Sequence, residues 1–429
     1  MSKRFLFVCA FSALSPAVAR EAFAEKSITK TDSYEVYTDG RAGAFVSYAR
    51  GDARPGPRTE EDGTLINDVL GGGLDALAVR PRIGPNQLSQ GTIENMRVRS
   101  GFVGNTFGLG VRMPQGSTTL TGYIQVWAFV ESEARRKYRQ NLADVRQGYV
   151  KAEGGWGSLL VGRSRALFSR AGTDVNALYA HRYGLGYPGS TDLNGPTAGH
   201  IGFGVLGSGF AAGVAYATPV IGGLQLTAGV YDPIQLQGAW TRTKYVRPEA
   251  ELTFEKPLGG LGKVFLFVNG GVQNVYKEDV DEGTAAGGVG YGGRVELGPV
   301  RLGATGHYGK GLGLSYALEA SDATIDPGGG LRKFDGYYLQ SQLVLGSVDL
   351  SAGYGITRVF LNPIDNERDA RGNIPHSIIK HQMGFSGGLV YHVTPSLHFD
   401  VDYFRANFAW FLGEKQVVDI VNSGLTIVW

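Results

Sequence analysis

The chain has 429 residues, with 41 basic and 39 acidic side chains and a formal net charge of +2. This length suits two or three soluble domains or one large barrel, and the near balance of charge argues against a nucleic-acid partner. Glycine accounts for 66 residues, about twice the usual ~7% share. Without a collagen-type repeat, so much glycine favours curved sheets whose strands approach closely.

The first 24 residues are predicted to be a signal peptide that is removed. Two basic residues open it, an apolar run covers 5–14, and small-x-small cleavage sites end at Ala19 and Ala24. Cleavage after Ala24 removes three bases, one acid and the only cysteine, Cys9, so the formal charge becomes 0. The mature chain, 25–429, is therefore expected to be an exported single domain without disulfides.

The segment 348–356 shows the pattern that dominates the rest of the chain. One parity holds Val348, Leu350, Ala352, Tyr354 and Ile356, and the other holds Asp349, Ser351, Gly353 and Gly355. Successive side chains of a strand point to opposite faces, so this strand has one apolar and one polar face. After the signal peptide the sequence contains no uninterrupted run of 18 apolar residues, so no membrane-spanning helix is predicted. The pattern favours an all-β transmembrane barrel, apolar toward lipid and polar toward a lumen.

Sixteen segments are predicted to be strands of this antiparallel barrel, joined alternately by short turns and long loops. They lie near 38–50, 94–113, 117–131, 144–154, 156–163, 200–217, 222–232, 246–256, 262–275, 284–297, 299–309, 332–346, 347–360, 378–393, 396–411 and 416–429. Short periplasmic turns and long outer loops are typical of outer-membrane barrels, and an even count places both termini at the periplasmic end. The third loop is expected at about 164–199, and counts of 14 or 18 strands stay open.

Several segments together resemble the general trimeric porins of the bacterial outer membrane. The similarity is densest over about 36–165 and at the C-terminus. Its motifs are Tyr37-Thr38-Asp39-Gly40-Arg41, Arg97-Val98-Arg99-Ser100-Gly101-Phe102, Leu120-Thr121-Gly122-Tyr123-Ile124-Gln125, Arg146-Gln147-Gly148-Tyr149-Val150, Gly155-Trp156-Gly157, Val161-Gly162-Arg163 and the terminal aromatic Trp429. Trp429 resembles the family's assembly signal, although that residue is usually phenylalanine.

The resemblance implies a water-filled channel for passive diffusion of ions and small hydrophilic solutes, with loop three folded into the lumen. It implies a homotrimer in contact with outer-membrane lipid and lipopolysaccharide, inserted by the barrel-assembly machinery. No enzymatic step, cofactor or bound metal is expected, and no nucleic-acid partner.

In this family, acids on loop three face basic residues on the opposite wall. The position of the motifs makes Arg41, Arg99 and Arg163 candidates for the basic wall of the constriction, and the alternation of the second strand adds Arg97. An arginine on the lipid face costs about 2–4 kcal/mol at mid-bilayer, which favours the lumen for these side chains. Asp174 and Asp192 are the acidic candidates on loop three.

Two other functions stay open. A substrate-selective channel for sugars or anions would have aromatic side chains along its lumen, and Tyr123, Trp127 and Phe129 share a parity that faces either lumen or lipid. Trp127 and Tyr149 are also candidates for aromatic girdles at the membrane interface. A plugged structural or adhesin barrel would instead bind partners through loop 51–93 or loop 132–143.

Two enzyme-like motifs are not expected to act as such. Residues 202–207 have the spacing of a dinucleotide fingerprint, but a predicted strand follows where that site needs a helix. Ser386 has nucleophile-elbow spacing but lies in the middle of a predicted strand, without the sharp turn that would present it.

Overall fold

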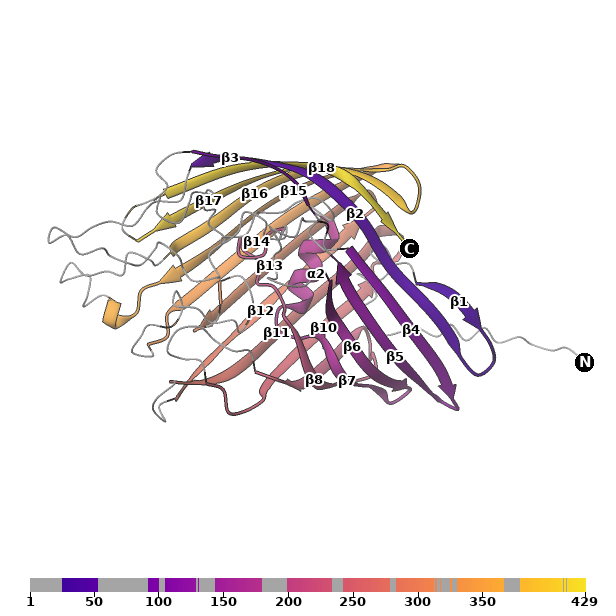
Figure 1. The fold of residues 1–429 in the computed structure, drawn as a ribbon. Coiled ribbons are helices and arrows are strands. Elements are labelled where there is room, and N and C mark those ends of the chain that lie inside the picture. The colour runs from indigo at the N-terminus through magenta and orange to yellow at the C-terminus, as the bar shows by residue number, and fades with distance from the viewer. Residues whose placement is uncertain are drawn as a thin grey trace, which may run out of the picture.

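The computed structural model shows one closed antiparallel barrel with a helix inside it (Figure 1). It describes residues 25–52, 92–99, 105–128, 130, 143–179, 199–233, 242–277, 283–311, 313–314, 317, 325, 330–365, 379–411, 413 and 415–429. The strands are β1 (Lys26–Lys30), β2 (Glu35–Asp52), β3 (Thr92–Arg99), β4 (Asn105–Gln115), β5 (Thr118–Ala128), β6 (Ala143–Gly154), β7 (Gly157–Arg165), β8 (Phe210–Ala217), β9 (Leu224–Tyr231), β10 (Arg247–Pro257), β11 (Gly262–Tyr276), β12 (Gly283–Leu297), β13 (Val300–Lys310), β14 (Lys333–Leu345), β15 (Val348–Phe360), β16 (Ile379–His392), β17 (Leu397–Trp410) and β18 (Lys415–Val428). The helices are α2 (Arg170–Tyr179) and the short 3-10 turn η3 (Gly259–Leu261).

The 18 hydrogen-bonded strands form a wall of 16. β3 and β4 both pair with β2, over 45–52 and 35–41 of that strand, so they are two halves of one wall strand. β1 pairs with the first residues of β2 and adds a short hairpin at the N-terminus. Pairing of β18 with β2 and of β9 with β10 closes the circle. The predicted fold class and the count of 16 are confirmed.

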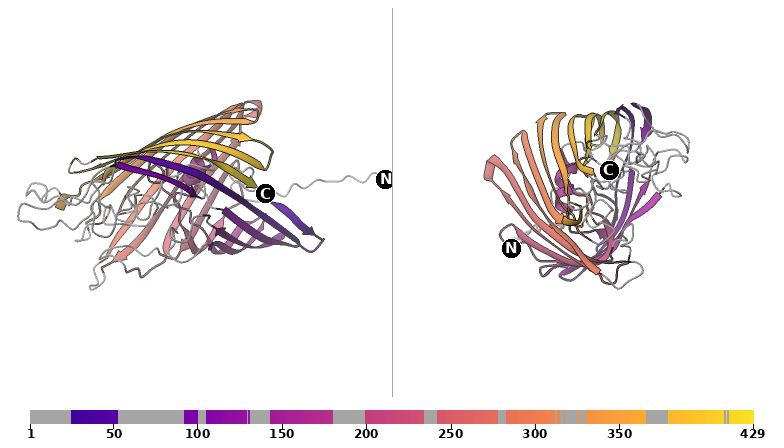
Figure 2. Two further views of the ribbon diagram at one scale, coloured as in Figure 1. Left: turned by 45° about the horizontal axis from the view of Figure 1, so that its top comes forward. Right: turned by 90° about the vertical axis from the view of Figure 1, so that its left-hand side faces the viewer.

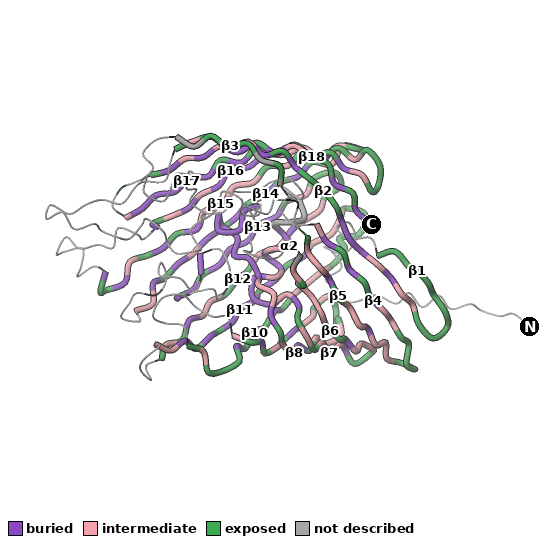
Figure 3. The backbone as a smooth tube through the Cα atoms, viewed as in Figure 1, coloured by how far each residue is buried: buried purple, intermediate pink, exposed green. Residues whose placement is uncertain are grey.

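The polarity of the wall is the reverse of that in a soluble protein. Buried and exposed residues alternate along many of its strands (Figure 3). On β14, Tyr337 and Leu339 are 40% and 53% exposed on the outside, whereas Tyr338, Gln340 and Gln342 are buried on the inside. β15 repeats this, with Leu350 exposed and Asp349 and Thr357 buried, as the alternation over 348–356 predicts. Among the described helices, none is both long and apolar enough to cross a bilayer.

The first described strand, β1, and the C-terminus lie at the same end of the barrel (Figure 1). The terminal residue Trp429 completes the ring there, because its carbonyl accepts a hydrogen bond from the Gly40 amide at 2.8 Å and its amide donates to the Gly40 carbonyl at 3.0 Å. The Trp429 ring also lies over Gly40, where a Cβ atom would stand 2.5 Å from it. Closure of the barrel thus uses the last residue of the chain.

The wall is uneven in strand length. β8 and β9 have 8 residues each and β7 has 9, whereas β11 and β12 have 15 each. The short strands flank the point where loop three leaves the wall and returns to it.

The predicted strand 200–217 is wrong in its first half. β8 begins at Phe210, and 199–209 belong to loop three, which therefore runs further than 199. Gly202 and Gly204 have φ angles of 82° and 96°, in the left-handed region that glycine favours. These turns fold the segment back on itself, and residues 199–208 are all buried instead of alternating.

Candidate functional site: the lumen and its third loop

Loop three enters the barrel directly after β7, and α2 lies inside the wall (Figure 2). Ala171 and Val175 of the helix pack against Phe265 and Phe267 of β11. The Gln340 side-chain amide of β14 donates to the Val175 carbonyl at 2.6 Å. The helix is therefore held against the inner face of β11–β14, as the resemblance to porins implies for loop three.

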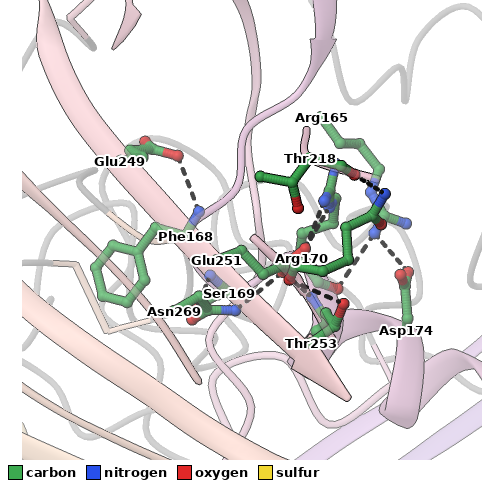
Figure 4. Close-up of polar contacts among 12 residues, drawn as sticks. Arg165, Phe168, Ser169, Arg170, Asp174, Thr218, Glu249, Glu251, Thr253 and Asn269 are labelled. Carbon is green, nitrogen blue, oxygen red and sulfur yellow. Dashed lines mark hydrogen bonds and ion pairs between the residues drawn. The ribbon is translucent and has the colours of Figure 1, made fainter. Parts of the chain in front are cut away.

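Three side chains of the wall hold the start of α2, and we call Glu249, Glu251 and Asn269 the loop-three anchor (Figure 4). Glu249 accepts a hydrogen bond from the Phe168 amide at 2.8 Å, and Asn269 Oδ1 accepts one from the Ser169 amide at 3.1 Å. Glu251 accepts from the Ala171 amide at 3.2 Å and from Arg170 Nε at 3.1 Å. Each anchor residue is less than 5% exposed.

The anchor supports a buried helix start, because Glu251 accepts from the Ala171 amide in the first turn of α2 while Glu249 and Asn269 hold the two residues before the helix. The first amides of an α-helix have no partner within the helix, and the positive end of its dipole favours a negative charge nearby. Ser169, just before the helix, has a φ angle of 65°, the one positive value on a non-glycine residue in the described chain. Its strained turn is fixed by the bond from its amide to Asn269.

Arg170 completes the anchor from the loop side. Burial acts to lower the pKa of Arg170, but the Glu251 carboxylate, together with Tyr231 and Asp174, raises it by more, so the pKa lies above its usual value. The guanidinium is charged at any physiological pH and forms a charge-assisted pair with Glu251. Glu251 would otherwise be an unpaired buried carboxylate, so the two groups stabilise each other.

Of the two acidic residues predicted to line the constriction from loop three, the structure describes one. Asp174 lies on α2, is 6% exposed, and forms an ion pair with Arg165 at 2.5 Å. Its carboxylate is therefore partnered by the last residue of β7 (Figure 4). Asp192 lies outside the described residues. An acidic face of loop three that acts on solutes remains a proposal.

The return segment of loop three, 199–209, packs against β14–β17. His200 is fully buried, with Nε2 at 2.6 Å from Ser386 Oγ and Nδ1 at 3.3 Å from the Phe203 carbonyl oxygen. The Phe203 ring packs edge-on against the rings of Phe404 and Phe408, with centroids 5.1 Å and 5.6 Å away. Ser386, singled out for its elbow spacing, thus helps to hold loop three.

A glycine on the wall makes this docking possible. A Cβ atom on Gly355 would stand 1.9 Å from the Phe203 carbonyl oxygen. We expect Gly355→Ala to displace the return segment at a cost of about 1–3 kcal/mol, seen as faster cleavage of loop three by protease in detergent. Gly387→Ala, on the neighbouring strand, is the control, because its nearest neighbour would be 3.9 Å away. Equal cleavage rates for the two variants would contradict this docking.

The wall formed by β2, β4, β5 and β6 carries inward-facing side chains in rows, because residues paired across these strands lie side by side. One row contains Tyr37, Gly110, Tyr123 and Tyr149, and the next contains Asp39, Gly108, Gln125 and Gln147. A third row, beside the second, contains Arg41, Thr106, Trp127 and Asp144. A fourth row, beside the first, contains Glu35, Arg112, Thr121 and Lys151.

Arg41 faces the lumen, as predicted. It is 5% exposed and shares its parity with buried Tyr37 and Ser47, whereas Val46 on the other parity is 43% exposed. Arg97 and Arg99 lie on β3, paired with Ser47 and Phe45 of β2, and their side chains lie outside the described part of the structure. The role of these arginines in a constriction remains a proposal.

The prediction for Arg163 is wrong. Its side chain is exposed and shares its parity with Leu159 and Val161, which are 39% and 48% exposed on the outer face. The neighbouring Gly162 occupies the inward position, paired with Tyr149. The run Leu159-Leu160-Val161 is apolar on both parities, so alternation could not show which way the next residues point.

The aromatic side chains of β5 and β6 face the lumen. Tyr123 donates a hydrogen bond to buried Asp39 at 2.8 Å, and Trp127 Nε1 donates to buried Gln125 at 2.9 Å. On the same strand, Ile124 is 48% exposed on the outer side. The prediction that Trp127 and Tyr149 belong to aromatic girdles at the membrane interface is therefore wrong. Tyr123 and Trp127, which could have faced either lumen or lipid, face the lumen. Phe129 lies outside the described residues.

The charges on this wall are largely paired. Lys151 lies 2.8 Å from Glu153, Arg146 lies 2.7 Å from Asp144, and Arg112 pairs with Glu25 and, at 3.7 Å, with Glu35. In the described part of the chain, no group of three or more His, Cys, Asp or Glu side chains is placed to hold a metal ion.

Comparisons with known proteins agree with the fold. No model of a known protein family matches the sequence, and no curated protein matches it. The outer membrane channel DcaP of Acinetobacter baumannii matches with a TM-score of 0.65 and 14% identity, over 94% of this chain and 99% of its own.

Two further solved structures agree. The anion-selective porin from Comamonas acidovorans matches with a TM-score of 0.57 and 12% identity, over 92% of this chain and 100% of its own. OmpF of Salmonella typhi, in complex with daunomycin, matches with a TM-score of 0.54 and 10% identity, over 95% of this chain and 100% of its own. The chain therefore has the fold of bacterial outer-membrane porins.

Proposed function

We propose that this chain forms a water-filled channel in the bacterial outer membrane, through which ions and small hydrophilic solutes diffuse passively. One observation supports this most. A closed barrel with an apolar outside and a polar inside holds a loop within its lumen through three buried wall side chains. The loop narrows a passage that the wall would otherwise leave wide. No chemical step is part of the proposal.

Current recording in planar lipid bilayers tests the channel. Insertion of the purified protein is expected to give conductance steps of uniform size. Sustained silence after verified insertion would instead support a plugged structural or adhesin barrel. That alternative has some support, because Leu314 and Ala317, between β13 and β14, are also buried against the inner wall.

The proposed basic wall of the constriction consists of Arg41, Arg97 and Arg99. Arg41→Gln removes one inward charge and is expected to shift the reversal potential in a salt gradient toward cation preference. Arg163→Gln is the matched control, since it removes an arginine from the outer face and should leave the reversal potential unchanged. Equal potentials for both variants would show that Arg41 does not act on the permeating ions.

The partners belong to the same proposal. One solved structure of this fold is described as OmpT of Vibrio cholerae in trimer form, and a homotrimer in contact with lipopolysaccharide is proposed here. Native mass spectrometry in detergent would show a mass of one chain if the trimer is wrong.

Trp429 is proposed as the signal read by the assembly machinery. Trp429→Ala should lose most of the outer-membrane yield and Trp429→Phe should keep it.

A further inference from the structure

The inner wall of β2–β6 contains a strip of aromatic side chains, which we call the tyrosine row: Tyr37, Tyr123 and Tyr149. The rings of Tyr37 and Tyr123 lie 6.2 Å apart in planes 12° apart, and those of Tyr123 and Tyr149 lie 5.4 Å apart at 38°. Gly110 makes the row continuous, because a Cβ atom there would stand 2.2 Å from the Tyr37 ring. The rings therefore lie side by side along the wall.

Only part of the row is open to the lumen. Tyr37 is 3% exposed and is covered by the Arg112 guanidinium, which lies 3.8 Å from its ring centre. Tyr123 and Tyr149 remain partly exposed. Four residues further along β5 from Tyr123, Trp127 is also partly exposed, and the Arg146 guanidinium lies 4.8 Å from its ring centre. A solute passing this wall meets aromatic surface at two levels about 13 Å apart along the strand.

Polar groups border the tyrosine row on both sides. Gln125 and Gln147 lie on the side of Trp127, and Arg112 and Lys151 lie on the other side. The Gln125 side-chain oxygen already accepts hydrogen bonds from Trp127 and Gln147, so this side chain is fixed in place. The ammonium of Lys151 has three donors, of which the bond to Glu153 uses one. Fixed donors and acceptors thus frame an apolar surface, which is how proteins orient small polar ligands.

The charge of the wall decides the class of solute. Lys151, Arg146 and Arg112 each have a carboxylate partner, and Asp39 adds a further carboxylate beside Tyr123, so the border of the tyrosine row carries polar groups without an excess of positive charge. A small anion would have to compete with those carboxylates. A neutral ring with an apolar face and hydroxyl groups at its edge meets both features without such competition.

We propose that the tyrosine row and Trp127 form a binding site for neutral ring-shaped sugars on the channel wall. The inference rests on the proposed channel and assigns it a solute class. The sugar ring lies against Tyr123 and Tyr149, and its hydroxyl groups bond to the bordering amide, ammonium and carboxylate groups.

Glucose and sorbitol test the site, because they carry similar hydroxyl groups but only glucose is a ring. In planar bilayers, glucose should reduce the ion current saturably, and sorbitol should reduce it only through viscosity. Tyr149→Ala should weaken the block about fivefold, and Tyr149→Phe should retain it. Tyr291→Ala, which removes a tyrosine that is 52% exposed on the outer face, should leave the block unchanged.

Titration of Trp fluorescence in detergent, with the same two sugars, separates this inference from the channel proposal. Binding of glucose by a barrel that passes no current would refute the channel and retain the site. Conductance steps with equal effects of glucose and sorbitol, and no fluorescence change, would overturn the sugar site and retain the channel. A block by gluconate that exceeds the block by glucose would show that the wall selects anions instead.

Discussion

Glu251→Gln is expected to release loop three from the wall and to open the channel intermittently to a higher conductance. The change removes the charge that holds Arg170 and leaves that guanidinium without its carboxylate. Breaking such a pair costs about 3–5 kcal/mol when both groups are fully buried. Arg170 is 30% exposed, so we expect about 3 kcal/mol here, and hence a rise of about 100-fold in the population of the undocked loop.

Single-channel recordings measure this directly as the frequency of brief high-conductance states. Glu255→Gln is the matched control, because it makes the same change on the same strand and the same inner face. Glu255 belongs to a looser group, with Lys263 Nζ at 3.7 Å, and does not contact loop three through any hydrogen bond or ion pair described above. If the Glu251→Gln channel is as quiet as the Glu255→Gln channel, the anchor does not control the loop.

Val268→Arg is expected to destabilise the folded barrel by about 2–4 kcal/mol, the cost of an arginine at the bilayer midplane. Val268 lies near the middle of β11 and is 55% exposed on the outer face. Its row on that face includes Tyr291 of β12. The guanidinium would therefore have to leave water for hydrocarbon or distort the lipid around it.

Urea-dependent folding into lipid vesicles gives the free energy of unfolding for this comparison. Leu297→Arg is the control, since Leu297 has the same outward face but lies at the end of β12, beside the turn to β13. Depth dependence predicts a cost of only about 0–1 kcal/mol there. Similar costs at both sites would mean that something other than lipid covers Val268.

Most of the fold can be predicted from the alternation of apolar and polar residues along the strands. Segments such as 348–356 alternate without a break, and the structure places each of their residues on the predicted face. The prediction failed where alternation was absent or accidental. Residues 200–208 mix glycine with apolar residues as a strand would, but all of them are buried against the inner wall, which only the closed barrel provides.

The anchor was missed for a different reason. Glu249 and Glu251 share one parity of a predicted strand, so the sequence could have placed both in the lumen. Nothing local says that their partners lie about 80 residues earlier in the chain, because that contact depends on how the barrel curves. The inward direction of Arg41 can be predicted because apolar residues alternate with it on β2. The direction of Arg163 could not be predicted, because its strand lacks such alternation.

The short strands β8 and β9 make one side of the wall low, and the bilayer beside that low side must adapt to it. At a tilt of about 45°, the 8 residues of β8 and β9 rise only about 19 Å, against about 35 Å for the 15 residues of β11 and β12. The apolar band of an outer-membrane barrel is about 25 Å tall. Unless a second subunit covers the low side, the lipid tails beside it must shorten or splay. Such thinning would bring headgroups and water toward Arg163, and hydrophobic mismatch would then explain how an outward arginine is tolerated there.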